Sequence, residues 1–379
     1  MKRPLALDLF CGVGGMSLGF EQAGFDVIGA VDAEKIHVET YSKNFPSCNA
    51  RCIDLSVVSG KELRKKTGVG KKSIAALFAG PPCQGFSLMG RRLRRDPRNS
   101  LVYDLARLIV EISPSYFVVE NVGGILIGDA KRVLETFIRR VETAGYSVVR
   151  PIRTLDAAEF GVPQRRRRVF LLGYQASLAA PQYPDPLYWF DADGYIPCPT
   201  IWEAISDLPK ISRYKYLTEV GEYMGRLGTP SAYAKVLRGQ FRQPDDLSLM
   251  RRTNGNGLSG CLRTDHTLKT ARRFQGTKQG EQDEVSRFYR LAKNGLAPTL
   301  RAGTGPDKGS YMAPRPIHPF QNRCITVREA ARLHSFPDWF YFHATKWHAF
   351  RQIGNSVPPL LARAVANSVF RALLANVQA

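Results

Sequence analysis

Short apolar runs alternate with helical spacings from the start of the chain to about Tyr174. The run at 5–10 is short and apolar except at Asp8, which is typical of a buried strand. Over 101–112, Leu and Ile recur at helical spacing, which indicates a helix that buries one face. This alternation is typical of an α/β fold, with helices on the faces of a βαβ sheet. The pattern predicts strands at 5–10, 27–31, 74–79, 116–119 and 169–173, and helices at 34–45, 101–112 and 130–144, with another helix ending near Gly24.

The pattern changes between about 180 and 320, where Pro, Gly, Arg and Tyr are common and periodicity is weak. Regularity returns at Thr326-Val327-Arg328-Glu329, which has the form of a capping box opening a helix through about Leu333. Pro358-Pro359 suits the first turn of a last helix that runs to about Ala375. We therefore expect an α/β domain at 1–178, a small irregular domain at 179–322, and a C-terminal part at 323–379 that packs back on the first domain.

Charge adds a candidate partner to this picture. The 379 residues include 54 Lys and Arg against 33 Asp and Glu, a formal net charge of +21. Such an excess favours a polyanion, with nucleic acid the first candidate, although a basic soluble protein without such a partner is the alternative. The seven cysteines have no disulfide or zinc spacing, so we expect no metal. Asp8 precedes any signal-peptide core, and no apolar run approaches the about 20 residues of a spanning helix, so we expect a reduced, cytoplasmic protein.

The first candidate site is Asp8-Leu9-Phe10-Cys11-Gly12-Val13-Gly14-Gly15, where a predicted strand runs into a glycine-rich turn and a helix. Glycines at such a turn let a cofactor approach the backbone and the helix N-terminus. Asp32, at the end of the second predicted strand, is placed to accept hydrogen bonds from ribose hydroxyls. The pattern fits NAD, FAD or S-adenosylmethionine, and a turn needed only for packing has the same form.

The second candidate is Cys83, in Gly80-Pro81-Pro82-Cys83-Gln84-Gly85-Phe86-Ser87, which follows a predicted strand directly. This position puts the thiol at the carboxyl edge of the sheet, where α/β folds bind ligands. A buried structural cysteine in a proline turn is the alternative. The basic stretch 91–98 comes next, and it suits either phosphate binding or a solvated loop.

Two further groups are predicted near the same edge. Glu120 ends the strand at 116–119, so it would emerge beside Cys83, and the two residues make a nucleophile and an acid. In Gln164-Arg165-Arg166-Arg167-Arg168, an extended backbone would place Gln164, Arg166 and Arg168 on one face. A surface charge run is the alternative interpretation of these arginines.

Taken together, these segments resemble the cytosine-C5 methyltransferase family. The uncovered stretch, about 175–320, is where that family keeps its variable target-recognition domain. The resemblance implies a Rossmann-like, S-adenosylmethionine-dependent methyltransferase sheet and a prokaryotic modification enzyme. The matching segments, in family order, are Phe10-Cys11-Gly12-Val13-Gly14-Gly15, Pro82-Cys83-Gln84, Glu120-Asn121-Val122, Gln164-Arg165-Arg166-Arg167-Arg168, Arg328-Glu329-Ala330-Ala331-Arg332-Leu333 and Gly354-Asn355-Ser356-Val357-Pro358.

The resemblance implies that Cys83 adds to C6 of cytosine, because this addition makes C5 nucleophilic enough to take a methyl group. A free thiol has a pKa of about 8.5, so a cationic neighbourhood would favour the reactive thiolate. Glu120 would contact N3 and the exocyclic amine of the base, and its pKa would need to be raised. Arg168 would hold the base, and Arg166 would order a loop or bind a phosphate.

The implied substrate is duplex DNA, from which the target base must be flipped out. The implied cofactor is S-adenosylmethionine. The residues expected to bind it are Phe10, Gly12, Val13, Gly14, Gly15, Asp32, Asp54, Pro82, Leu101, Asn355 and Ser356. The residues expected to contact DNA are Gln84, Ser87, Arg94 and Gln164, and further candidates for phosphates or guanines are Arg251, Arg252, Arg272 and Arg273.

Three alternatives stay open. A tRNA cytosine methyltransferase belongs to the same family, but that branch tends to carry a Cys-Phe-Thr triplet, and no Cys here precedes Phe. A DNA-binding regulator without activity would not need Cys83, Glu120 and Arg168. An NAD-dependent oxidoreductase leaves Pro81-Pro82-Cys83-Gln84 unexplained. For the main hypothesis we expect a monomer on DNA and a cognate restriction endonuclease.

Overall fold

The computed structural model describes residues 2–82, 100–189, 196–251, 257–303 and 315–378. Several of the candidate residues fall between these ranges. Those that lie outside the described residues are Cys83, Gln84, Ser87, Arg94 and Arg252.

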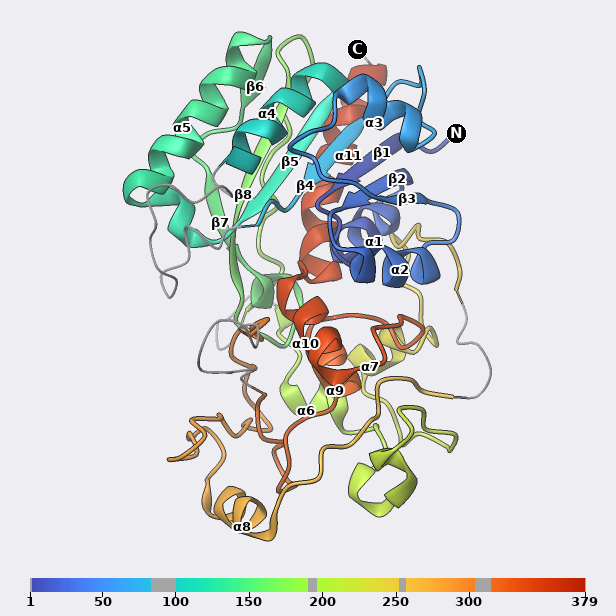
Figure 1. Ribbon diagram of the computed structural model, residues 1–379, viewed down its shortest axis with the longest axis vertical. Coiled ribbons are helices and arrows are strands. Elements are labelled where there is room, and N and C mark those ends of the chain that lie inside the picture. The colour runs from blue at the N-terminus through green and yellow to red at the C-terminus, as the bar shows by residue number, and fades with distance from the viewer. Residues whose placement is uncertain (1, 83–99, 190–195, 252–256, 304–314, 379) are drawn as a thin grey trace.

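One eight-stranded sheet forms the centre of the α/β part (Figure 1). Its strands are β1 (Leu5–Leu9), β2 (Asp26–Asp32), β3 (Asn49–Cys52), β4 (Ala76–Ala79), β5 (Tyr116–Asn121), β6 (Tyr146–Val148), β7 (Arg153–Asp156) and β8 (Arg167–Gln175). The order is β3-β2-β1-β4-β5-β8-β6, and β7 also pairs with β8. The first five strands in this order, β3, β2, β1, β4 and β5, run parallel to one another. Strand β8 is antiparallel to each of its neighbours.

Helices cover both faces of this sheet, as predicted (Figure 1). They are α1 (Gly15–Gln22), α2 (Lys35–Asn44), α3 (Gly60–Lys66), α4 (Ser100–Ile112), α5 (Gly128–Thr143) and α11 (Pro359–Gln378), with 3-10 turns η2 (Gly123–Leu126) and η3 (Ala157–Phe160). Because strand side chains alternate between faces, Ala6 and Phe78 enter one core with α1, α2 and α11. Leu7 and Leu77 enter a second core with α3, α4 and α5. The α/β fold class is therefore confirmed.

The predicted strands and helices all occur, and the elements that the pattern misses are short or polar. Strand β3 has the sequence NARC and lies at the sheet edge, half-buried or exposed, so no apolar run marks it. Strands β6 and β7 span three and four residues, too few to show an alternation. Helix α3 buries Gly60 and Leu63 and is otherwise largely exposed.

The irregular region, 179–322, contains little regular structure in its described residues. Its elements are β9 (Tyr188–Trp189), β10 (Ile196–Pro197), α6 (Ile201–Ile205), η4 (Ile211–Arg213), η5 (Lys215–Thr218), α7 (Ala232–Leu237) and α8 (Leu268–Gly276). Leu208 and Tyr233 join the core that contains α1, so this region shares its packing with the sheet. The boundaries at 178 and 322 stay a prediction.

The C-terminal part consists of α9 (Val327–Leu333), α10 (Lys346–Asn355) and α11. The capping box predicted at Thr326 is present: the Thr326 side chain accepts from the Glu329 N–H, and the Glu329 carboxylate accepts from the Thr326 N–H. Helix α11 returns to the sheet and packs closely on α1. A Cβ at Gly19 of α1 would lie 2.5 Å from the Ala362 Cβ, so only glycine permits this approach.

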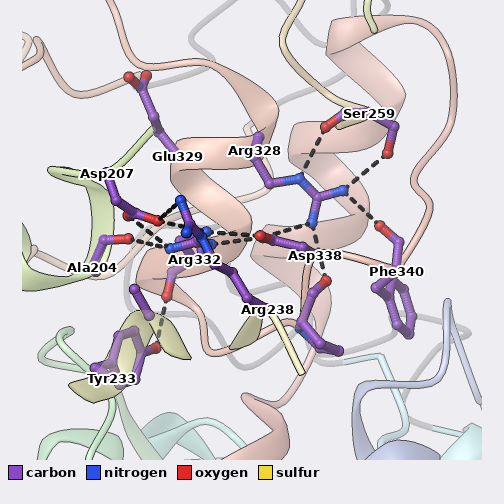
Figure 2. Close-up of polar contacts among 12 residues, drawn as sticks. Ala204, Asp207, Tyr233, Arg238, Ser259, Arg328, Glu329, Arg332, Asp338 and Phe340 are labelled. Carbon is purple, nitrogen blue, oxygen red and sulfur yellow. Dashed lines mark hydrogen bonds and ion pairs between the residues drawn. The ribbon is translucent and has the colours of Figure 1, made fainter. Parts of the chain in front are cut away.

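A buried ionic network joins the irregular region to α9 (Figure 2). Arg332 is fully buried and donates to Asp338 at 2.6 and 2.7 Å and to Asp207 at 3.1 Å. Arg238 forms a second ion pair with Asp207, at 2.7 Å. Because Asp207 follows α6 and Arg238 caps α7, the network fixes both helices against the C-terminal part.

Arg328, one turn before Arg332 on α9, fixes another segment in the same way (Figure 2). Its Nε donates to the Ser259 carbonyl and its Nη2 to the Ser259 hydroxyl, both at 2.9 Å. It also donates to the carbonyls of Pro337 and Phe340. Helix α9 therefore carries two buried guanidinium groups that bind the irregular region.

Replacing Arg332 with Met should lower the free energy of unfolding by about 3–5 kcal/mol, because Asp207 and Asp338 lose their shared buried cation. The measurement is urea unfolding followed by fluorescence. The control is Lys131→Met, which removes an exposed 3.8 Å ion pair with Glu135 and should have little effect. Equal effects of the two substitutions would contradict this account of the network.

Candidate active site

The carboxyl ends of the parallel strands bring the candidate groups to one edge of the sheet. Leu9 of β1 pairs with Ala79 of β4, and Ala79 pairs with Val119 of β5. The glycine turn, the proline segment and Glu120 therefore leave the sheet side by side. A Cβ at Gly80 would lie 3.4 Å from Glu120 Oε2, so the segment that leads to Cys83 starts beside this carboxylate.

Glu120 and Arg168 form an ion pair at this edge. Arg168 Nε lies 2.9 Å from Glu120 Oε1, and their side chains are 14% and 11% exposed. Strands β5 and β8 pair antiparallel with Glu120 opposite Phe170, which places Arg168 within reach. Burial raises the pKa of the Glu120 carboxyl, although the positive charges of Arg168 and Arg166 act against this rise. The structure thus brings together the two groups that the sequence placed at one edge, with a carboxyl that holds its proton more tightly than usual.

The four arginines alternate between the interior and solvent. Arg165 and Arg167 are exposed, whereas Gln164 and Arg166 are buried. This alternation is the one that an extended backbone predicts. The run is therefore neither a uniform surface charge nor a uniform binding face.

Arg166 holds backbone rather than phosphate. Its guanidinium is 1% exposed and donates to the carbonyls of Leu300 (2.9 Å), Gly354 (2.6 Å) and Ser356 (2.9 Å). Of the two roles expected for Arg166, these contacts fit the ordering of a loop. Phosphate binding does not fit, because the side chain is buried and its two terminal nitrogens donate to carbonyls inside the protein.

Gln164 also faces the interior, which corrects the expectation that it contacts DNA. It is 0% exposed, its Oε1 accepts from the Leu300 N–H at 3.0 Å, and its Nε2 donates to the Leu333 carbonyl at 3.1 Å. The same Nε2 lies 3.0 Å from Nδ1 of His334. All of its polar atoms are thus used to join protein segments.

His334 is a site residue that the sequence reasoning missed. Its Nε2 lies 3.0 Å from the Ser356 carbonyl, which accepts only, so Nε2 carries the proton and Nδ1 accepts from Gln164. Burial lowers the pKa of His334 well below its usual range, and the charge of Arg166 acts in the same direction. His334 is therefore a neutral side chain that joins Gln164, before β8, to Ser356 in the segment 354–358. A lone histidine at a helix end offers no local signal of this role.

The glycine turn needs its glycines for two different reasons. Gly14 has φ +95° and packs against Phe45, whose Cε2 would lie 2.3 Å from an added Cβ. Gly15 packs against residues 354–358, the C-terminal motif, since its Cβ would lie 2.4 Å from the Val357 carbonyl oxygen. Gly12, in contrast, has φ +53°, and among the described residues no atom lies within 4 Å of the position of its Cβ. Gly14 and Gly15 are therefore packed tightly against other segments, whereas the described residues leave Gly12 accessible.

Two carboxylates lie at or just beyond the ends of neighbouring strands, an arrangement that fits an adenosyl group. Asp32 ends β2 and accepts from the N–H groups of Gly12 (2.9 Å) and Glu34 (2.8 Å). Asp54 follows β3 and is exposed, and hydrogen bonds from Ser56 lower its pKa. Carboxylate oxygens at the ends of neighbouring strands suit hydrogen bonds from ribose hydroxyls and an amine.

The other expected cofactor residues differ in exposure. Val13 is 1% exposed, so its side chain belongs to the core and its backbone alone can face a ligand. Asn355 is exposed, and the Ser356 hydroxyl donates to the Gln352 carbonyl at 2.7 Å. The half-buried residues of the expected set are Phe10, Pro82, Leu101 and Ser356.

The arginines expected in DNA recognition are not equivalent. Arg251 is bound to Glu21 through both terminal nitrogens at 2.6 Å, so its guanidinium is not free for phosphates or guanines. Arg273 donates to Asp283 at 2.7 Å and is partly exposed. Arg272 is exposed on α8. These placements correct the expectation for Arg251 and leave Arg272 as the accessible member of the described set.

Within the described ranges, no group of three or more His, Cys, Asp or Glu side chains is arranged to hold a metal ion. Among the helices of those ranges, none is both long and apolar enough to cross a membrane.

Replacing Arg166 with Lys should lower the free energy of unfolding by about 1–3 kcal/mol or more, because one ammonium cannot reach all three carbonyls and leaves buried acceptors unpaired. Arg165→Lys is the matched control. Arg165 is the exposed neighbour of Arg166, so this substitution should change the free energy of unfolding by no more than about 0.5 kcal/mol. Denaturant unfolding measures both variants. If Arg166→Lys is as stable as Arg165→Lys, the three carbonyl contacts do not support the site.

The chain is similar to known proteins over almost its whole length. Residues 6–371 match the family described as C-5 cytosine-specific DNA methylase. The chain is 48% identical to the Type II methyltransferase M.XorII of Xanthomonas oryzae pv. oryzae, over 98% of this chain and 86% of that protein. It is 31% identical to the Type II methyltransferase M.AgeI of Thalassovita gelatinovora, over 96% of this chain and 98% of that protein. The crystal structure of a DNA modification methyltransferase encoded within an E. coli prophage superposes with a TM-score of 0.79 at 32% identity, covering 98% of this chain and 99% of that one. The chain therefore belongs to the C-5 cytosine-specific DNA methylase family.

Proposed function

We propose that this protein methylates C5 of a flipped cytosine within a specific duplex DNA sequence, through a covalent adduct between Cys83 and C6 of the base. Membership of the family makes the protein a DNA cytosine-C5 methyltransferase and implies S-adenosylmethionine as the methyl donor. The observation that carries the proposed mechanism is the Glu120–Arg168 pair at 2.9 Å, beside the segment that leads to Cys83. A net charge of +21 supports duplex DNA as the partner.

The proposed reaction begins with the Cys83 thiolate, whose sulfur forms a bond to C6 and pushes electron density to C5. When bound, S-adenosylmethionine supplies a methyl group that C5 can take. The C5 proton then leaves to a base, the C5–C6 double bond forms again, and Cys83 departs as a thiolate. The products are 5-methylcytosine and S-adenosylhomocysteine, so the enzyme is regenerated unchanged.

Glu120 is the proposed proton donor at N3. Negative charge builds on the ring as sulfur attacks, and a proton delivered to N3 offsets it. When Cys83 is eliminated, N3 returns this proton to Glu120. The raised pKa of Glu120 suits this role, because burial makes the carboxyl keep its proton to a higher pH than an exposed glutamate does. Arg168, paired with Glu120, would turn its remaining donors to the base.

The cofactor is proposed to lie over the turn at 10–15, with its ribose hydroxyls at Asp32 and its adenine amine at Asp54. Two observations support this placement: no atom of the described residues lies within 4 Å of a Cβ on Gly12, and Asp32 and Asp54 lie at or just beyond the ends of neighbouring strands. Phe10, Pro82, Leu101, Asn355 and Ser356 are proposed to complete the pocket.

Duplex DNA is proposed to be recognised by the irregular region, and base flipping to be assisted by Gln84, Ser87 and Arg94. The Type II relatives support a role in a restriction-modification system, so we propose that methylation protects DNA from a cognate endonuclease. A tRNA methyltransferase, the second candidate, is distinguished by the substrate that becomes labelled.

The purified protein should transfer labelled methyl groups from S-adenosylmethionine to duplex DNA, and Cys83→Ser should abolish turnover while DNA binding survives. Cys52→Ser, which changes an exposed cysteine on β3, should keep full activity as the control. Normal turnover by the Cys83 variant would show that the adduct is not required. Label found on tRNA alone would favour the second candidate, and bisulfite sequencing of DNA from expressing cells would identify the methylated sequence.

Replacing Glu120 with Gln should lower kcat by a factor of about 10²–10⁴, the usual contribution of a general acid. Because burial raises the pKa of Glu120, wild-type activity should fall as pH rises through that pKa, when the acid loses its proton. The Gln variant should lack this alkaline decline. The control is Glu142→Gln, at a surface pair with Arg150, whose pH profile should match that of the wild type. A decline that persists in the Glu120 variant would rule out Glu120 as its source.

A further inference from the structure

Arg251 belongs to the irregular region, but its contacts lie in the α/β part. Its Nη1 and Nη2 bind the two carboxylate oxygens of Glu21, both at 2.6 Å. Glu21 is a 5% exposed residue of α1, and its Oε1 also accepts from the Leu249 N–H at 2.7 Å. Helix α1 is the helix that follows the glycine turn. The pair therefore connects the irregular region to the element that begins at the cofactor turn.

Two aromatic rings hold the Arg251 guanidinium in place. Its central carbon lies 4.9 Å from the ring centroid of Phe45 and 4.9 Å from that of Trp339. A guanidinium at this distance from an aromatic ring is attracted by the ring electrons, and its flat shape suits contact with a ring. Arg251 is thus fixed by a bidentate ion pair and by a ring from each of two other segments.

Phe45 lies between Arg251 and the glycine turn. Its Cε2 would be 2.3 Å from a Cβ on Gly14, so the ring lies directly against the backbone at this position. Tyr41, whose ring centroid is 4.6 Å from that of Phe45, approaches the same glycine. Gly14 has φ +95°, which glycine adopts without steric cost, and the rings of Phe45 and Tyr41 leave no room for a Cβ at this position. The contacts therefore run from Arg251 through Phe45 to the backbone of the turn.

The surrounding strap, 242–251, is attached to the α/β part mainly by polar contacts. Leu247, Leu249 and Met250 are 50%, 47% and 77% exposed, so apolar burial contributes little. The Leu247 N–H donates to the Gln22 carbonyl at 2.7 Å, and Asp245 pairs with Arg363 of α11. Within the strap, Arg251 is the residue whose side chain reaches the support of the turn.

We propose that Arg251 is a positioning residue for cofactor binding. Its pair with Glu21 holds the guanidinium against Phe45, and Phe45 in turn supports the backbone of Gly14 in the shape that the cofactor requires. The inference rests on the proposed placement of S-adenosylmethionine over this turn. It adds that a residue of the irregular region sets the affinity of the cofactor site.

The test is calorimetric titration of the full-length protein with S-adenosylhomocysteine in the absence of DNA, so that neither methyl transfer nor DNA binding contributes. Arg251→Met removes the charge and both hydrogen bonds and should weaken binding on the order of tenfold, which corresponds to about 1.4 kcal/mol. Arg251→Lys keeps the charge but loses the planar fork, so it should restore only part of the affinity. In steady-state assays, KM for S-adenosylmethionine should rise while kcat and the Kd for DNA stay near wild type.

Arg242→Met is the matched control. Arg242 is an exposed arginine of the same strap, and it donates to the carbonyls of Asp246 (2.7 Å) and Ser248 (2.6 Å) inside the strap. Its loss should leave the affinity for S-adenosylhomocysteine unchanged. If Arg251→Met does not fold, Arg251→Lys and Glu21→Gln provide the same comparison, since each weakens the pair from one side.

The outcomes separate the inference from the proposed function. Wild-type affinity in the Arg251 variants, even with a lowered melting temperature, would overturn the inference and leave a purely structural clamp. Equal weakening by Arg242→Met would also overturn it, because the effect would then belong to the strap as a whole. A wild-type protein that methylates no DNA and binds no S-adenosylhomocysteine would instead overturn the proposed function.

Discussion

The buried guanidinium of Arg166 holds together the segments that form the candidate site. It comes from the arginine run before β8 and donates to carbonyls at 300, 354 and 356, so it joins the irregular region and the C-terminal motif to the sheet. The C-terminal motif in turn lies against Gly15, which only a glycine allows. His334 and Gln164 add hydrogen bonds between the same segments. The cofactor turn, the Glu120–Arg168 pair and the irregular region are thus placed relative to one another by buried polar contacts.

Buried arginines also change what the net charge means. Arg166, Arg328 and Arg332 are each at most 1% exposed, and their terminal nitrogens donate to groups inside the protein. These cations hold segments of this chain and do not face DNA. The excess of +21 therefore overstates the charge available to a polyanion, although exposed arginines such as Arg165 and Arg167 stay accessible.

Local patterns in the sequence predicted much of the fold and part of the site. Apolar runs located β1, β2, β4, β5 and β8, because central strands are buried on both faces. The ends of those strands then placed Glu120 at one edge with Arg168, and alternation separated Arg166 from Arg165. By contrast, the hydrogen-bond partners of the Arg166, Gln164 and Arg251 side chains lie 134 to 230 residues away in the sequence. No local sequence pattern therefore indicates these contacts. This is why Gln164 and Arg251 were expected on DNA and His334 was overlooked.

The central claim is that Cys83 becomes covalently bonded to the target cytosine during the reaction. Duplex DNA that carries 5-fluorocytosine at the methylated position, incubated with the protein and S-adenosylmethionine, tests this directly, because fluorine at C5 cannot leave as a proton does. Mass spectrometry of the digested product should then show one DNA-linked peptide, with the adduct on Cys83. An adduct on another residue, or no adduct on DNA that is otherwise methylated efficiently, would contradict the account.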